Sequence, residues 1–391
     1  MKPVLEVVVV AVLSCLTMAQ EPAKPSDDPV EKVRAAYQAI LDTRAKGRKE
    51  VEVLKEEVKR LPPESAERRA VVEKLNNAAR ASKAPLTPFL DVLADTDWSK
   101  FDTAADNKLL KEGLAGLAVD LERGDKAIAA SRHYLELFAA EPVSVGIRVR
   151  HLPLALLRAG RIDEARKELR LGIDQAKDQV KGSAALLLGD IESVLGNFDD
   201  AKKAFAEAAA CGKVLAEFAA CRVALIGKPR PPLEVRQWVG SEPLTDADTQ
   251  GKVQLLGFWA SWAPPARAAT RQWNAMRDEL AAQGLVCIGI CKLWGHGYLP
   301  NDESELENGG SSYQGMKPET YFEHVQKFHT NLKLHFPTAI VDEAAYANFA
   351  IKPLPQVELV GRDGKVRLVT TAPLDDRELV RFAVRHLLAE K

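Results

Sequence analysis

Phe258-Trp259-Ala260-Ser261-Trp262-Ala263-Pro264-Pro265-Ala266-Arg267 is the stretch of this 391-residue sequence that decides the fold of its C-terminal part. It follows an apolar run, Val253 to Gly257, and it leads into a segment whose apolar residues recur at helical spacing. A short apolar run followed by this spacing is typical of a buried strand that turns into a helix. The stretch therefore predicts a strand, a turn and a helix of an α/β domain.

The ten residues resemble the active-site turn of the thioredoxin-like thiol–disulfide oxidoreductases of the TlpA type, which reads F-W-A-S-W-C-P-P-C-R. Every position agrees except the two cysteines, which are Ala263 and Ala266 here. Disulfide exchange needs an attacking thiolate and a resolving thiol, and alanine supplies neither. The resemblance implies the fold, and it also implies a degenerate active-site turn formed by Trp262, Ala263, Pro264, Pro265 and Ala266.

The resemblance extends over residues 228–391, so it does not depend on the turn alone. Trp238 to Leu244, followed by Gly251-Lys252-Val253, is similar to the segment that opens the family's fold. Gly284 to Ile290 is a continuous apolar run, which is typical of a strand buried on both faces. The order of these segments implies a thioredoxin-like domain over residues 228–391.

The last part of the resemblance lies near the C-terminus. Ile351 to Val360, followed by Gly361 to Val366, resembles the family's cis-proline segment and places Pro355 at that proline. Arg362-Asp363-Gly364-Lys365 also predicts a hairpin turn from its own residues, because it lies between two runs of β-forming residues. Leu374 to Leu388 is apolar at helical spacing and is expected to form the last helix.

Length and composition limit the function classes. A chain of 391 residues is long enough for two or three domains, and an apolar content of 46% is ordinary for a globular protein with a sizeable core. The formal net charge is −1, so the chain as a whole lacks the excess of positive charge that favours binding to nucleic acid or to a membrane surface. We therefore expect no nucleic-acid partner.

The N-terminus is expected to be a targeting segment. A short apolar core from Val7 to Leu13, followed by Thr17-Met18-Ala19, predicts a cleaved signal peptide over residues 1–19 and a polar linker over 20–29. The alternatives are an uncleaved anchor, or a lipoprotein signal with a lipid anchor on Cys15. The sequence thus predicts an exported protein, periplasmic, in the cell envelope or secreted, with no membrane span after cleavage.

Four cysteines follow the targeting segment, and we expect all four to be free. Cys287 and Cys291 are four residues apart on a predicted strand, which separates their Cα atoms by about 13 Å at ~3.3 Å per residue. A disulfide needs a Cα separation of about 4.4–6.8 Å. Cys211 and Cys221 are expected to lie on two successive helices, and burial in the core is the simplest role for each thiol.

The N-terminal half is expected to be all-α. Residues 30–84 predict a helical hairpin, and residues 85–227 predict a helical array in which Gly124, Gly160 and Gly196 recur 36 residues apart. This period is close to the ~34 residues of tetratricopeptide repeats, and each glycine would allow a tight turn between two helices. The alternative is a helical bundle with chance alanines. Pro153 is expected to kink or break the first helix of the middle copy.

An insertion at about 292–317 interrupts the thioredoxin-like domain, and we expect a mobile surface loop there. His296 in this insertion, together with three later histidines, lacks the spacing of metal ligands, so no metal and no cofactor is predicted. Cys291 lies near the carboxyl end of its strand, where open α/β sheets bind ligands, and is the weak alternative nucleophile.

These observations predict a multidomain chain: an all-α helical hairpin, a tetratricopeptide-like array and an α/β thioredoxin-like domain. The favoured hypothesis is an exported, redox-inactive interaction protein whose array binds a protein or an extended peptide through residues 143–157 and 181–195. The groove beside Pro355 would be a second docking site. The alternative is a thiol–disulfide oxidoreductase that uses Cys291 or the cysteines of a partner.

Overall fold

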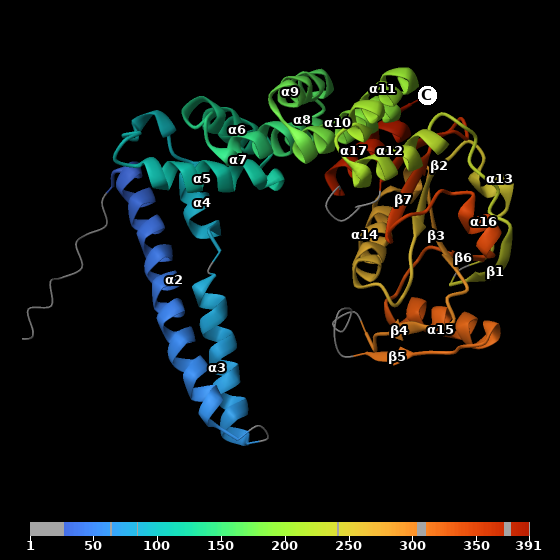
Figure 1. The fold of residues 1–391 in the computed structure, drawn as a ribbon, viewed down its shortest axis with the longest axis horizontal. Coiled ribbons are helices and arrows are strands. Elements are labelled where there is room, and N and C mark those ends of the chain that lie inside the picture. Colours follow the sequence, from blue (N-terminus) through green and yellow to red (C-terminus); the bar gives the residue numbers. More distant parts are fainter. Residues whose placement is uncertain are drawn as a thin grey trace, which may run out of the picture. The chain divides into compact units, whose positions relative to one another are not determined.

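The computed structural model describes residues 27–62, 65–83, 85–240, 242–302, 310–370 and 377–390 (Figure 1). The predicted signal peptide and Cys15 lie outside these residues, as does most of the predicted linker. The chain forms two compact units, Met1–Leu117 and Ala118–Lys391. Among the helices in the described part of the chain, none is long and apolar enough to cross a membrane.

The first unit is helical and contains the predicted hairpin. Its elements are α2 (Pro29–Arg60), α3 (Ala66–Ser82), α4 (Thr87–Ala94), η1 (Trp98–Lys100) and most of α5 (Asn107–Val119). The Asp28 and Ser65 side chains accept hydrogen bonds from the first turns of α2 and α3, which stabilises both starts. Leu54, Val71 and Ala78 form the small core between these two helices.

The second unit begins with helices in pairs. They are η2 (Leu121–Arg123), α6 (Asp125–Leu137), α7 (Pro142–Gly146), η3 (Ile147–His151), α8 (Leu152–Arg158), α9 (Ile162–Gln175), α10 (Asp178–Val194), α11 (Phe198–Ala209) and α12 (Lys213–Leu225). Gly124, Gly160 and Gly196 lie between successive helices with φ of 58°, 72° and 81°, a region that favours glycine. Assignment of these pairs to a tetratricopeptide array stays a prediction.

Pro153 distorts its helix, as the sequence predicts. The α7 segment runs into α8 through η3, a single π-helical turn that ends two residues before the proline. Proline has no N–H and its ring collides with the carbonyl of the preceding turn, and widening that turn relieves the collision. The chain therefore continues as one distorted helix instead of breaking.

The second unit continues with a six-stranded mixed sheet in the order β1-β6-β3-β2-β7-β8. The strands are β1 (Val235–Val239), β2 (Val253–Phe258), β3 (Leu285–Lys292), β6 (Thr338–Val341), β7 (Gln356–Val360) and β8 (Val366–Thr370). β2, β3 and β6 are parallel, whereas β1, β7 and β8 pair antiparallel with their neighbours. The predicted hairpin at Arg362–Lys365 is confirmed, because β7 and β8 pair across it.

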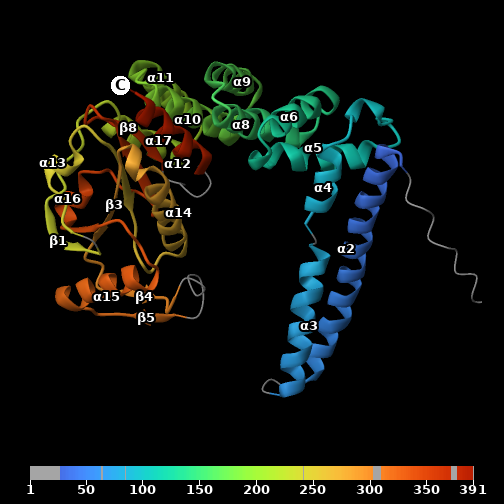
Figure 2. The same cartoon turned by 180° about the vertical axis from the view of Figure 1, so that it is seen from behind.

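Helices cover both faces of this sheet (Figures 1 and 2). They are α13 (Asp246–Thr249), α14 (Pro264–Leu280), η4 (Ala281–Gln283), α15 (Pro318–Asn331), α16 (Glu343–Ala347) and α17 (Arg377–Ala389). Two consecutive residues of β2, Leu255 and Leu256, belong to two different hydrophobic clusters, so the strand is buried on both faces. The predicted last helix, Leu374 to Leu388, corresponds to α17, and its first three predicted residues lie outside the described residues.

The helices of the second unit and its sheet pack together. The Arg367 guanidinium on β8 donates to the carbonyls of Ser193 and Val194 at the end of α10, the latter at 2.7 Å. The backbone N–H of Gly227 donates to the carbonyl of Val366. α17 packs on α8 and α10. At the opposite end of the sheet lie α15 and a hairpin of β4 (Gly297–Leu299) and β5 (Ser311–Tyr313) (Figures 1 and 2).

Candidate functional site

The turn singled out by the sequence connects β2 to α14. Ala263 precedes α14 as its N-cap with extended backbone, and Pro264 and Pro265 form the first helical turn. Ala263 and Ala266 are both buried. The Leu354–Pro355 peptide bond is cis, and because Phe258 pairs with Gln356, Pro355 lies beside the start of the turn. The turn and the proline therefore occupy the relation that the resemblance implies, without the cysteines.

A hydrogen-bonded serine and histidine lie beneath this turn. Ser261 Oγ is 2.9 Å from His324 Nε2 on α15, and both side chains are buried. Burial lowers the pKa of His324 to about 4, so the imidazole is neutral near pH 7 and can accept the serine proton. The two residues are 63 positions apart, and the sequence analysis missed the pair because no local pattern joins them.

The insertion closes over this pair. Part of it forms a two-stranded hairpin, β4 (Gly297–Leu299) with β5 (Ser311–Tyr313), where the sequence predicts a mobile loop; residues 303–309 lie outside the described residues. The Tyr298 N–H donates to Ser261 Oγ at 3.4 Å. A Cβ on Gly297 would lie 2.6 Å from Ser261 Oγ, so glycine permits this close approach. Backbone pairing of the two strands explains why this segment is not a loop.

Aromatic side chains form the exposed rim of the turn. Trp262 is 39% exposed, and its ring centroid lies 5.3 Å from that of Trp294 and 5.6 Å from that of His296. Lys292 Nζ lies 4.4 Å from the Trp294 ring centroid, within the range of a cation–π contact. This rim offers apolar stacking surface to a bound polypeptide but no nucleophile.

The remaining thiols are poorly placed for exchange chemistry. The four described cysteines, Cys211, Cys221, Cys287 and Cys291, are free, as predicted. Cys291 is 1% exposed, and burial raises the pKa of its thiol to about 12. Burial also raises the pKa of Cys287 and Cys221 above the usual value. Because the thiolate is the nucleophile, these groups are unreactive near neutral pH.

The histidines are engaged in structural contacts. His329 Nε2 is 2.8 Å from Thr338 Oγ1, and His335 Nδ1 is 3.0 Å from the Asp278 carboxylate. Within the residues that the structure describes, no group of three or more His, Cys, Asp or Glu side chains is placed to hold a metal ion.

A second concave surface lies on the predicted binding face of the helices. A cavity of about 310 Å³ separates η3 from α10 and is lined by residues that include Val149, Val180 and Leu187. An adjoining cavity of about 300 Å³ shares Arg150 and His151 with it and extends toward α14 and α17. We call the two cavities together the helical groove. The lining of the first cavity combines apolar side chains with Arg150, whereas the second cavity is also lined by Arg377 and by the carboxylates of Asp120, Glu122 and Glu378.

Comparisons with known proteins place the similarity in one part of the chain. Over 69 residues the chain is 39% identical to the thiol:disulfide interchange protein DsbE of Escherichia coli (strain K12), covering 17% of this chain and 35% of that protein. Over 68 residues it is 43% identical to the thiol:disulfide interchange protein HelX of Rhodobacter capsulatus, covering 17% and 36%. The chain thus spans about a third of the length of these curated relatives. No protein-family model matches.

Two solved structures resemble part of the chain. A thiol-disulfide isomerase from Corynebacterium glutamicum matches 42% of this chain and 99% of its own, with 19% identity and a TM-score of 0.32. The thioredoxin-like superfamily protein SPOA0173 matches 42% and 99%, with 18% identity and a TM-score of 0.31. The sheet order and the partial sequence similarity together define a thioredoxin-like fold related to interchange proteins of the DsbE and HelX type.

Proposed function

We propose that this protein is an exported, redox-inactive interaction protein that keeps the fold of a thiol:disulfide interchange protein and lacks its chemistry. The observation that carries the proposal is the turn itself. Ala263 and Ala266 occupy the two positions where exchange needs thiols, while the helix start and the cis bond before Pro355 remain. The geometry is retained and the nucleophile is absent.

No other described thiol takes over the role. Cys291 is the sequence's alternative nucleophile, but its buried thiol has a pKa of about 12 and almost no exposed surface. A reactive cysteine is usually partly exposed and has a lowered pKa. Burial of Cys291 therefore argues against an oxidoreductase that works through this residue.

The binding role is supported by the helical groove. It is formed by parts of the two segments expected to contact a partner, 143–157 and 181–195, and it is hollow and partly apolar. Val143 in the first segment and Val180, immediately before the second, are exposed apolar side chains, which suit the side chains of an extended polypeptide. In the cavity between η3 and α10, Arg150 adds positive charge and no carboxylate of the described residues lines the wall, so an acidic polypeptide is the favoured partner there.

The second candidate is an oxidoreductase that acts with a partner's cysteines. The similarity to DsbE and HelX favours it, because both relatives are interchange proteins by name. In this case the thioredoxin-like domain would bind and position a partner's disulfide, and the partner would supply both thiols.

A disulfide-reduction assay tests the proposal. The wild type should reduce a small protein disulfide no faster than the dithiol reductant alone, whereas Ala263→Cys/Ala266→Cys should be active because only the thiols are missing. Ala266→Cys alone is the matched control, since one buried resolving thiol cannot turn over. Wild-type activity above the background would contradict the proposal, and its loss in Cys291→Ser would assign it to that thiol.

A further inference from the structure

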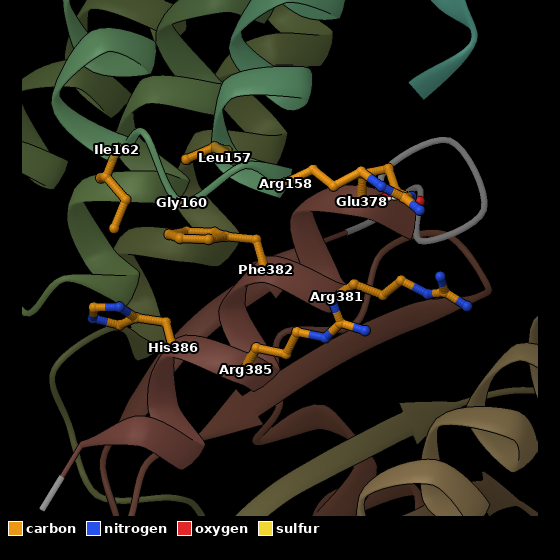
Figure 3. A pocket seen from close by; sticks show the side chains of 9 residues that line it. All are labelled: Leu157, Arg158, Gly160, Ile162, Glu378, Arg381, Phe382, Arg385 and His386. Carbon is orange, nitrogen blue, oxygen red and sulfur yellow. Dashed lines mark hydrogen bonds and ion pairs between the residues drawn. The ribbon is translucent and has the colours of Figure 1, made fainter. Parts of the chain in front are cut away.

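A pocket lies where the helical segment meets the C-terminal helix of the thioredoxin-like domain (Figure 3). Its walls come from the end of α8 and the start of α9 on one side and from α17 on the other. We call it the junction pocket. It lies apart from the degenerate turn, it shares among the described residues only Glu378 with the lining of the helical groove, and nothing in the proposed function uses it.

One side of the junction pocket is apolar. The Phe382 ring on α17 faces Leu157 and Ile162 across the hollow (Figure 3). The His386 ring lies 5.8 Å from the Phe382 ring and extends this surface. Burial lowers the pKa of His386, so near pH 7 it adds a neutral polar group instead of a charge. The part of a ligand that contacts this side is therefore expected to be apolar.

The other side is cationic. Arg158, Arg381 and Arg385 line it, against a single lining carboxylate, Glu378. Arg158 pairs with Glu378 at 2.9 Å and also with Glu122, and Arg385 pairs with Glu279 at 3.0 Å.

Arg381 is the arginine available to an incoming anion. Among the residues that the structure describes, Arg381 makes no ion pair or hydrogen bond, although its charge contributes to lowering the pKa of Glu122. The Arg381 and Arg385 side chains leave α17 on the same side (Figure 3). An anion held there would contact two guanidinium groups, which bind carboxylates well.

We propose that the junction pocket binds a small carboxylate joined to an apolar group, with the carboxylate at Arg381 and Arg385 and the apolar group against Phe382. The cavity volume of about 270 Å³ lies just below the ~300–1,000 Å³ of drug-sized ligand sites, so one small group fills it. Such a group occurs at the C-terminus of a peptide ending in an apolar residue, and in a free aliphatic or aromatic acid.

Binding in the pocket has a consequence for the whole second unit. The ligand would touch both the helical segment and α17, so it would stabilise their contact and raise the melting temperature with the logarithm of its concentration above the dissociation constant. This inference does not depend on the redox-inactive assignment, because no residue of the turn takes part.

Calorimetric titration of the full chain with four probes tests the proposal. The probes are 3-phenylpropanoate, its amide, a tetrapeptide ending in Phe with a free carboxylate, and the same peptide amidated. We expect saturable binding of at least one acid and at least tenfold weaker binding of its amide. The acid that binds better identifies the source of the ligand. Equal binding of acid and amide, or no saturable binding at millimolar concentration, overturns the proposal.

Variants of the full chain locate the site. Arg381→Gln should weaken acid binding at least tenfold, and Arg381→Lys should restore part of the loss because it retains the charge. Arg236→Gln is the matched control, an arginine of β1 that pairs with Asp342 outside the pocket, and it should stay within twofold of the wild type. Melting curves check that each variant is folded. Unchanged affinity in a folded Arg381→Gln variant would refute the assignment.

Discussion

The turn and the junction pocket lie in the same compact unit, but side chains fill the space at the turn and leave a cavity at the junction pocket. At the turn, Ser261, His324 and the insertion hairpin fill the space, and the described cysteines nearby are buried. At the junction pocket, arginines and an apolar ring face a hollow. The insertion hairpin packs over the turn, whereas polar side chains at the junction pocket face an unfilled cavity. A cavity of this kind can hold a ligand.

The largest expected effect comes from breaking the contacts between β8 and the end of α10. Arg367→Met removes a buried guanidinium that donates to Val194 O and pairs with Glu390 at 2.6 Å. Breaking such a buried arrangement costs on the order of 3 kcal/mol in the free energy of unfolding, which denaturant titration would detect. The control is Arg385→Met, an exposed arginine whose ion pair contributes about 0–1 kcal/mol. Equal effects of the two variants would show that Arg367 does not stabilise the contact between β8 and α10.

The next effect concerns acid stability near the turn. The pKa of His324 falls from 6.5 in the unfolded chain to about 4 in the fold, so the unfolded state binds more protons between these values. Its contribution, up to about 3 kcal/mol, is complete above pH 6.5 and is lost as the pH falls toward 4.

His324→Asn should therefore flatten the decline in unfolding free energy between pH 6.5 and 4.5. The difference between wild type and variant is the readout, because Glu358, whose pKa burial raises to about 8, changes stability in the opposite direction. A variant that declines as steeply as the wild type would exclude His324 as the acid-sensitive group.

A smaller effect tests how tightly the insertion closes the turn. Gly297→Ala places a Cβ against Ser261 Oγ and His324 Nε2, and overpacking of this kind costs about 1–3 kcal/mol. Gly146→Ala is the matched control, because a Cβ there meets nothing within 4 Å and its helical backbone favours alanine. Urea unfolding curves compare the two. If Gly297→Ala is as stable as the wild type, the hairpin is not packed against the Ser261–His324 pair.

The smallest expected effect concerns the helical groove. Val180 is 44% exposed on α10, and Val180→Glu should weaken binding of a carboxymethylated, unfolded polypeptide about tenfold, since it adds negative charge where an acidic chain would lie. Val53→Glu on α2, where the valine is 66% exposed, is the control and should bind as the wild type does. Fluorescence anisotropy measures both. Unchanged binding by Val180→Glu would remove the groove as the docking site.

Features with a local cause were predictable from the sequence, and features made by distant contacts were not. The α2–α3 hairpin, the distorted helix before Pro153 and the β7–β8 turn each follow from residues a few positions apart. The Ser261–His324 pair joins residues 63 positions apart, and Arg158 pairs with Glu378 across 220 positions. Such contacts depend on how helices pack on the sheet, which leaves no periodic signal.

The candidate site divides in the same way. The turn and Pro355 could be found because their residues match a family motif in order. The loss of both cysteines could be seen in the sequence. The inaccessibility of Cys291 could be seen only in the folded structure, because its burial there raises the pKa of the thiol. The junction pocket combines α8, α9 and α17, and no single segment of sequence carries its pattern.

We expect that no thiol near the turn is available for exchange in the folded protein. Brief treatment of the native chain with an alkylating reagent, followed by mass spectrometry of each cysteine, tests it most directly. We predict that Cys287 and Cys291 stay unmodified in the native protein while both are fully alkylated in denaturant, because both are buried and have raised pKa values. Rapid alkylation of Cys291 in the native protein would contradict the claim and favour an oxidoreductase.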